Sequence, residues 1–473
     1  MRLQFDSTSY MLLLSLTFLM FHLGPKKLRV TVLLGASLVF YGSWNAPFLI
    51  LVFYSAILDF LVARRIQSAT EAQKKKRWLI ISLISNLSVL AVFKYANFFR
   101  ESLHIALPEM ASLAAPWSII LPIGISFYTF QTMSYSIDVY KGRIDPESNF
   151  IDFMLYVCFF PQLIAGPIER AGHLMPQIKA VASYRLRRDD LHTGFLLLSW
   201  GLFKKAALSD NLARIVDVAY GNPMAHEGLD LLIATYAFAF QIFFDFSAYS
   251  DMARGAAALF GIKLVRNFNL PYLAEDPPDF WRRWHISLSE WIRDYLYIPL
   301  GGSKAGSSRT LVNLTLAMAL AGLWHGAAWH FVVWGLFHGL LLVAYRLLSP
   351  AFGRAFSGLP SWFNQGLRIA LMFHFACLGW VLFRANSMAD ALLILKRITI
   401  WIGTGMPTEH QGAGTTLLAL ILVFFLMIWN ERDRVFHRLA AKPIGYATLV
   451  SAALILVAIF APEVTSPFIY FQF

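Results

Sequence analysis

The chain has 473 residues, of which 58% are hydrophobic and only 14% are charged. Soluble domains carry about 25% charged residues, so the composition excludes an ordinary soluble protein. Long apolar runs predict an all-α polytopic membrane protein instead. The formal net charge of +12 does not require nucleic acid, because Lys and Arg gather in short loops between apolar runs, as in cytoplasmic loops. Cys158 and Cys377 both lie in apolar runs, so a disulfide framework is not expected.

Apolar runs alternate with basic clusters in the N-terminal part of the chain. The first run has neither a strongly basic stretch before it nor a cleavage-site pattern after it, so it is predicted to span the membrane rather than to serve as a signal peptide. If each run crosses once, the basic clusters fall on one side, which should be the cytoplasm, and the N-terminus lies outside. The runs are residues 10–23, 30–44, 47–63, 78–93 and 117–139.

The middle of the chain is less regular. The apolar run 150–160 leads into Pro161, Gly166 and Pro167, which cannot continue a straight helix. We expect a re-entrant or broken segment that is buried in protein or faces water. Apolar runs then follow at 191–203, 231–246 and 260–273. Asp245 lies among phenylalanines and needs a buried partner, for which we expect one of the arginines Arg282, Arg283 and Arg293.

Residues 279–295, with the sequence DFWRRWHISLSEWIRDY, form the most charged and aromatic segment. On a single helix, Trp281 and His285 are four residues apart and share a face. Guanidinium groups suit phosphate and carboxylate groups, so an anionic cofactor would be bound here. The alternative is an amphipathic interfacial helix with Trp anchors and snorkelling arginines. The glycine-bearing basic loop 297–304 that follows is a weak anion motif by itself. The predicted cofactor-binding residues are Trp281, Arg282, Arg283 and Arg293.

The apolar stretch 311–348 is too long for one span. It would make about 57 Å of helix at 1.5 Å per residue, whereas a bilayer core is about 30 Å thick. The stretch must therefore contain a break, and Gly322, Gly326 and the nearby histidines mark its place. His325 lies roughly 24 Å of helix beyond Arg309, which predicts a position at membrane depth.

An ionisable side chain at membrane depth is costly and indicates function. A neutral imidazole at residue 325 can act as a general base on a hydroxyl without a metal. The alternative is a core histidine bonded to a neighbouring helix. The H-E-x-x-H pattern is absent here, so no metal is expected. His330, Trp334 and His338 recur every four residues on one helix face, and a continuous helix would place His325 well round from them.

The last three apolar runs are residues 369–383, 415–429 and 444–460. Between the first two, the segment 388–401 is expected to lie in the interface. The cluster 431–442 is basic overall and should be cytoplasmic, which leaves the tail 463–473 outside. We therefore expect a single integral-membrane domain over 1–473, with N-terminal spans in 1–145, a core in 146–400 and C-terminal spans in 401–473.

Several stretches resemble one known family. Residues 281–302, WRRWHISLSEWIRDYLYIPLGG, are similar to the signature of the membrane-bound O-acyltransferase family. Residues 322–326, GLWHG, resemble its second signature, which carries the active histidine. Residues 121–131, 159–168 and 467–473 match as well, so the resemblance covers most of the chain. Within the family, the chain is similar to the branch that acetylates alginate, cellulose and peptidoglycan, and more distantly to teichoic-acid D-alanylation proteins.

The resemblance implies a helical bundle with re-entrant segments around a central tunnel. Acetyl-CoA would be the donor on the cytoplasmic side, His325 the catalytic base and His285 a second catalytic histidine. The protein would lie in a bacterial inner membrane and pass acetyl to a periplasmic partner that modifies a polysaccharide, with alginate as the first expectation. We expect the outward tail from Phe468 to contact that partner.

A proton-coupled transporter or polymer-export channel would also place polar groups at membrane depth. However, a proton path does not need the basic and aromatic segment around His285, and many transporters contain repeats that we do not find in this sequence. A non-catalytic scaffold would require that His325 be dispensable. The sequence therefore predicts an enzyme, and alginate, cellulose and peptidoglycan stay open as acceptor polymers.

Overall fold

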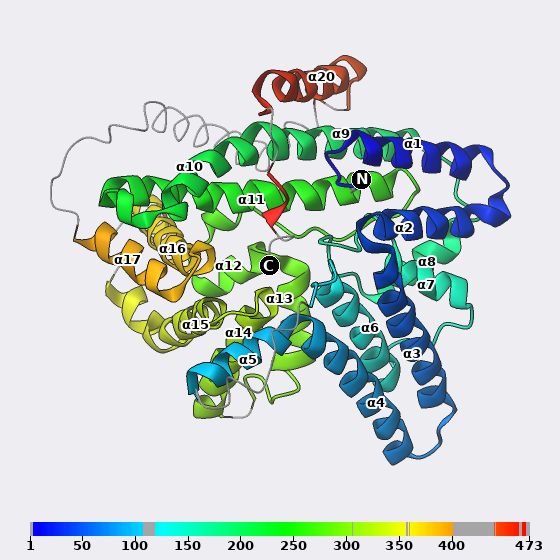
Figure 1. Ribbon diagram of the computed structural model, residues 1–473, viewed down its shortest axis with the longest axis horizontal. Coiled ribbons are helices and arrows are strands. Elements are labelled where there is room, and N and C mark those ends of the chain that lie inside the picture. The colour runs from blue at the N-terminus through cyan, green and yellow to red at the C-terminus, as the bar shows by residue number, and fades with distance from the viewer. Residues whose placement is uncertain are drawn as a thin grey trace. The chain divides into compact units, whose positions relative to one another are not determined.

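The computed structural model describes residues 3–106, 119–304, 306–355, 358, 360–400, 439, 441–462 and 466–469. All regular elements in these ranges are helices (Figure 1). The prediction of an all-α polytopic membrane protein is confirmed, while the predicted run 415–429 lies outside the described residues. Six stretches of the described chain are long and apolar enough to cross a membrane: Lys26–Ser68, Ala72–His104, Gly228–Ala258, Trp329–Pro350, Ser361–Arg384 and Pro443–Phe460.

The chain divides into two compact units. The first comprises Met1–Leu198 and Tyr249–Val265, and the second comprises Ser199–Ala248 and Arg266–Phe473. The helices α9 (Arg188–Leu202) and α11 (Gly228–Ala258) contribute residues to both units.

In the first unit, a buried cluster of hydrogen-bonded polar side chains joins three apolar helices. Asp59 of α3 is fully buried, and its carboxylate accepts hydrogen bonds from Ser82, from the Asn86 amide at 2.7 Å and from the Ser136 hydroxyl at 2.5 Å. A buried carboxylate is costly unless it is hydrogen-bonded, so these bonds tie α3, α4 and α6 together. The helices of this unit are α1 (Thr8–Leu23), α2 (Arg29–Asn45), α3 (Leu49–Ser68), α4 (Ala72–Leu90), α5 (Ala96–Ala106), α6 (Ile125–Tyr140), α7 (Phe150–Cys158) and α8 (Ala171–Ala180).

Residues 159–170 form the broken segment that the sequence predicts. The helix α7 ends at Cys158, and irregular turns follow up to α8. Residues 159–169 are all buried, and the Glu169 carboxylate accepts a hydrogen bond from the Val265 N–H at 2.6 Å. This burial in protein is what allows irregular backbone in a membrane protein.

The second unit contains the predicted break in the stretch 311–348. The helix α14 ends at His325, and α15 begins at Trp329. A Cβ added to Gly322 would lie 2.1 Å from the Phe331 carbonyl oxygen, so only glycine lets these antiparallel helices approach so closely. The helices of this unit are α10 (Asp210–Gly221), α12 (Pro277–Arg283), α13 (Ile286–Ile292), α14 (Ser307–His325), α15 (Trp329–Ala355), α16 (Ser361–Arg384), α17 (Met388–Thr399) and α20 (Pro443–Phe460).

Asp245 has a lysine as its buried partner, and the expectation of an arginine is wrong. The Lys205 ammonium lies 2.9 Å from the carboxylates of both Asp245 and Asp210. Lys205 also donates to the Ser466 carbonyl oxygen at 2.6 Å, and Asp245 accepts from the Ile469 N–H at 2.7 Å. The chain end at 466–469 is thereby fixed to buried charges.

Phe468 is only 1% exposed, and its ring centroid lies 4.5 Å from the Lys205 ammonium. The expectation that the tail from Phe468 offers an outward contact is therefore wrong for this residue. The remaining tail, residues 470–473, lies outside the described residues.

Candidate active site

The segment 279–295 is not one helix. The helix α12 ends at Arg283, α13 begins at Ile286, and His285 between them has a φ of 41°. This left-handed conformation is uncommon for a residue other than glycine. The start of α12 is fixed locally, because the Asp276 carboxylate accepts the Asp279 N–H at 2.7 Å as an N-cap. The expectation of a single helix, on which Trp281 and His285 share a face, is wrong, since His285 forms a joint between two short helices. The alternative of one amphipathic interfacial helix is wrong for the same reason.

Backbone bonds from residues 267–269 hold this joint. The Asn269 N–H donates to the Arg283 carbonyl oxygen at 2.9 Å, and the Ile286 N–H donates to the Asn267 carbonyl oxygen at 2.9 Å. The Asn267 side chain, only 1% exposed, accepts the Ser287 N–H at 3.2 Å. An uncommon backbone conformation persists where surrounding structure fixes it. Sequence reasoning missed Asn267 as a site residue, although Asn267 and Asn269 interrupt the predicted apolar run 260–273.

The structure brings the two predicted catalytic histidines together through one tryptophan. The His285 ring centroid lies 6.0 Å from that of Trp324, and the Trp324 centroid lies 5.0 Å from that of His325. Both histidines are buried, with exposed fractions of 0% and 4%. The Phe246 ring lies edge-on to His285 at 4.6 Å. The pair therefore occupies an aromatic environment with little access for water.

His325 also contacts the helix face that it was expected to avoid. Its ring centroid lies 5.0 Å from that of Trp334 on α15, because α14 ends at His325 and α15 folds back along it. The shared face of Trp334 and His338 is confirmed by a centroid distance of 4.9 Å. The His330 ring nitrogen lies 3.1 Å from the Leu382 carbonyl oxygen.

The predicted cofactor-binding residues separate into two groups. Trp281 packs its ring 5.1 Å from that of His338 and joins the aromatic cluster. Arg282 and Arg283 both pair with Asp279, at 3.4 and 2.9 Å. Arg293 pairs with the adjacent Asp294 at 2.7 Å. More than half of the Arg282 and Arg293 side chains is exposed, with fractions of 64% and 54%, so these two guanidinium groups can meet a ligand at the protein surface.

The glycine loop after α13 does not form a cradle of free N–H groups. The Gly301 N–H donates to the Ile298 carbonyl oxygen and the Gly302 N–H to the Tyr297 carbonyl oxygen, both at 3.0 Å. The Asn313 amide of α14 donates to the Gly302 carbonyl oxygen at 3.3 Å. The loop therefore ties the end of the π-helical turn Arg293–Tyr297 to α14.

Burial determines the charge state of His285. Removing the imidazole from water lowers the pKa of His285 to about 3, because burial penalises the charged form. The ring therefore stays neutral near pH 7, and a neutral imidazole can accept a proton at one nitrogen and donate a hydrogen bond from the other.

A buried histidine pair in an all-helical membrane protein, next to exposed arginines, fits an enzyme that handles an acyl group. The chain belongs to the membrane-bound O-acyltransferase family, whose profile matches residues 43–389. It is an acyltransferase of that family.

Individual relatives cover most of the chain. The protein is 37% identical over 433 residues to the probable alginate O-acetylase AlgI of Pseudomonas aeruginosa, with 89% of this chain and 81% of that protein covered. It is 39% identical over 455 residues to the probable alginate O-acetylase AlgI of Azotobacter vinelandii, with 95% and 88% covered. It is 37% identical over 385 residues to the peptidoglycan O-acetyltransferase of Helicobacter pylori, with 76% and 72% covered.

Proposed function

We propose that this protein takes acetyl from cytoplasmic acetyl-CoA and passes it across the bacterial inner membrane for O-acetylation of an exopolysaccharide of the alginate type. A periplasmic protein would receive the acetyl group and modify the polymer. The observation that carries the proposal is the buried arrangement of His285, Trp324 and His325 at the end of α14. Similarity to two proteins named alginate O-acetylase supports the choice of polymer.

In the proposed reaction, His325 acts as the general base. One ring nitrogen takes the proton from an acceptor hydroxyl while that oxygen forms a bond to the thioester carbonyl carbon. The carbon–sulfur bond then breaks, and the departing thiolate takes the proton back from His325 to give free CoA. A thioester is already activated, so this chemistry needs a base and hydrogen-bond donors rather than a metal.

His285 has a second role in this proposal. As a neutral imidazole it donates an N–H to the carbonyl oxygen on which negative charge develops, and its water-poor surroundings strengthen that bond. Arg282, Arg283 and Arg293 bind the phosphates of CoA through their guanidinium groups. Because Arg282 and Arg283 share Asp279, a phosphate has to compete with that carboxylate.

The test is acetyl transfer from labelled acetyl-CoA in membranes that contain His325→Ala. We expect a loss of about 10²-fold or more, which is the usual effect of removing a general base. The matched control is His374→Ala, which removes an exposed histidine on α16 and should leave transfer unchanged. Transfer at the wild-type rate in a folded His325→Ala protein would overturn the role of this residue.

Peptidoglycan is the second candidate acceptor, because the Helicobacter pylori relative is named a peptidoglycan O-acetyltransferase and is 37% identical to this chain. Cellulose is the third, on the family resemblance alone. Ester-linked acetate should be measured in the exopolysaccharide, cellulose and peptidoglycan of cells with and without the gene. If acetate were lost from peptidoglycan alone, the acceptor would be peptidoglycan rather than alginate. The proposed acyl-transfer chemistry would still hold.

A further inference from the structure

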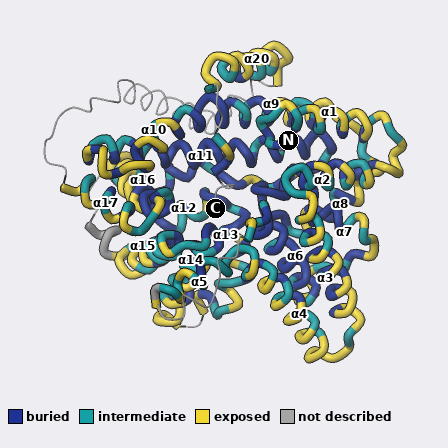
Figure 2. Tube along the Cα trace, in the orientation of Figure 1, coloured by how far each residue is buried: buried dark blue, intermediate teal, exposed yellow. Residues whose placement is uncertain are grey.

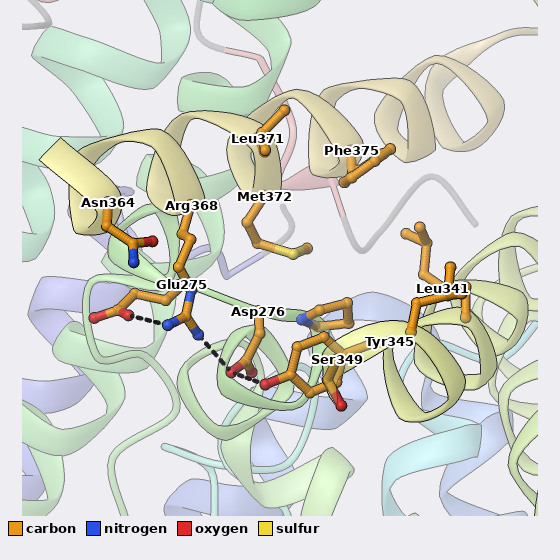
Figure 3. A pocket seen from close by; sticks show the side chains of 13 residues that line it. Glu275, Asp276, Leu341, Tyr345, Ser349, Asn364, Arg368, Leu371, Met372 and Phe375 are labelled. Atoms are coloured by element: carbon orange, nitrogen blue, oxygen red, sulfur yellow. Dashed lines mark hydrogen bonds and ion pairs between the residues drawn. The ribbon is translucent and has the colours of Figure 1, made fainter. Parts of the chain in front are cut away.

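A cavity of about 370 Å³ lies between α15, α16 and the start of α12 in the second unit (Figure 3). Its volume is in the range of small-molecule sites, which is about 300–1,000 Å³. Most of the wall is apolar, and the polar residues gather at one end around Arg368 (Figure 3). The apolar part is lined by Leu341, Ala344, Leu348, Leu371, Met372 and Phe375.

The polar end holds two carboxylates and one guanidinium. The Arg368 guanidinium lies 3.3 Å from a Glu275 oxygen and 3.6 Å from an Asp276 oxygen. The Tyr345 hydroxyl donates to the same Asp276 oxygen at 2.9 Å. The Arg282 guanidinium lies 3.9 Å from the other oxygen of Asp276, so two carboxylates meet two guanidinium groups and the cavity end carries no net charge. Such an end suits a headgroup with one positive and one negative group.

The polar end offers partners for both charges of a zwitterionic headgroup. The Arg368 guanidinium lines the cavity, and 40% of its side chain is exposed. A ligand in the cavity carries an ammonium toward Glu275 and Asp276 and a phosphate toward Arg368. An ammonium with N–H donors forms charge-assisted hydrogen bonds with carboxylates, which a quaternary ammonium cannot form.

The walls of the cavity belong to helices that can span a membrane. The helices α15 and α16 both supply candidate spans, and the lining side chains Leu371 and Phe375 are 43% and 40% exposed. We propose that this cavity binds a phospholipid with an ethanolamine headgroup, with an acyl chain along the apolar wall and the ammonium at Glu275 and Asp276. Among the lining residues, Arg368 alone is cationic, which does not match the several phosphates of CoA, so the proposal keeps this cavity separate from the donor site.

The experiment is native mass spectrometry of the purified full-length protein in detergent. It is titrated with phosphatidylethanolamine, phosphatidylcholine and phosphatidylglycerol of identical acyl chains. We expect the ethanolamine lipid to bind about tenfold more tightly than either of the others, since one charge-assisted hydrogen bond contributes roughly that factor. Equal binding of phosphatidylglycerol would overturn the proposal.

Two variants test the site itself. Ala344→Trp fills the apolar part and should reduce binding of phosphatidylethanolamine about tenfold or more. Leu347→Trp is the control, because Leu347 is on the same helix and 60% exposed but does not line the cavity. Equal binding by both variants, or equal loss in both, would place the lipid elsewhere.

Glu275→Gln tests the headgroup contact without filling the cavity, and it decides the matter if Ala344→Trp fails to fold. We expect binding of phosphatidylethanolamine to fall to the level of phosphatidylcholine. An unchanged preference for ethanolamine would contradict the ammonium site. Displacement of the lipid by acetyl-CoA in the wild-type protein would also overturn the proposal, because the cavity would then be the donor path.

Discussion

His285 shows how one residue combines a backbone feature with a chemical one. Its left-handed conformation turns the chain between α12 and α13, and its burial keeps the imidazole neutral. Its neighbour in space, Trp324, connects it to His325. The same conformation that breaks the helix therefore places the ring within the aromatic cluster.

The depressed pKa of His285 predicts sensitivity of the fold to acid. Its pKa is about 3 in the folded protein, against an ordinary value of 6.5. The unfolded chain therefore binds a proton between these values that the folded protein does not bind, so stability falls as the pH drops below about 6.5. At pH 5 this effect amounts to about 1–2 kcal/mol.

The variant His285→Asn should remove this part of the acid sensitivity, because asparagine tolerates a left-handed conformation and does not titrate. Thermal unfolding in detergent between pH 7 and pH 5 measures the effect, with His374→Asn as a matched control for an exposed histidine. The wild-type protein should lose more stability than His285→Asn over this range. Parallel losses in the two proteins would contradict the depressed pKa.

At the scale of elements, the break after His325 could be predicted and the break at His285 could not. The first follows from length alone, because residues 311–348 exceed the thickness of a bilayer as one helix. The second depends on hydrogen bonds from Asn267 and Asn269, which lie too far along the chain for a helical pattern to reveal. For the same reason the sequence suggests an arginine as the partner of Asp245, whereas the partner is Lys205, 40 positions earlier in the chain.

The packing of α15 against α16 yields a prediction about the active site. A Cβ at Gly379 on α16 would lie 2.7 Å from a His338 ring nitrogen and 3.4 Å from the Trp334 indole nitrogen. Gly379→Ala should therefore push these rings, and Trp334 contacts His325. We expect a loss of about 1–3 kcal/mol in stability, as for other overpacked sites, together with reduced acetyl transfer.

Gly366→Ala is the matched control for that variant. Gly366 is on the same helix, and an added Cβ meets nothing within 4 Å. Alanine also favours the helix over glycine by up to about 1 kcal/mol, so this variant should be neutral or slightly stabilised. Thermal unfolding and the labelled acetyl-transfer assay distinguish the two. Equal behaviour of both variants would show that the contact at Gly379 does not matter.

At the scale of the whole molecule, hydropathy predicts membrane helices but not their surroundings. The helix α20 exposes most of its residues, whereas α11 is buried along most of its length (Figure 2). Both are candidate spans by composition. The difference lies in polar residues such as Gln241, Asp245 and Ser247 on α11, since polar side chains within membrane helices face protein rather than lipid.

The segment 466–469 helps to hold the second unit together. Lys205 neutralises two buried carboxylates, and the segment 466–469 supplies a carbonyl oxygen to Lys205 and an N–H to Asp245. Burial alone would lower the pKa of Lys205, but Asp245 and Asp210 raise it above its ordinary value. The lysine is therefore charged at neutral pH, and the chain end completes its hydrogen bonds.

Deleting residues 468–473 should therefore lower thermal stability as well as polymer acetylation. The deletion removes the Ile469 N–H and the buried Phe468 ring, and burying an aromatic side chain contributes about 1.5–3 kcal/mol. Lys205→Ala should cost more, about 3–5 kcal/mol, because it leaves two carboxylates buried without a cation. Thermal unfolding of both variants in detergent shows which of them loses more stability. If the tail served only to contact a partner protein, the truncated chain would melt at the wild-type temperature while acetylation was lost, and the anchoring role of Phe468 and Ile469 would be excluded.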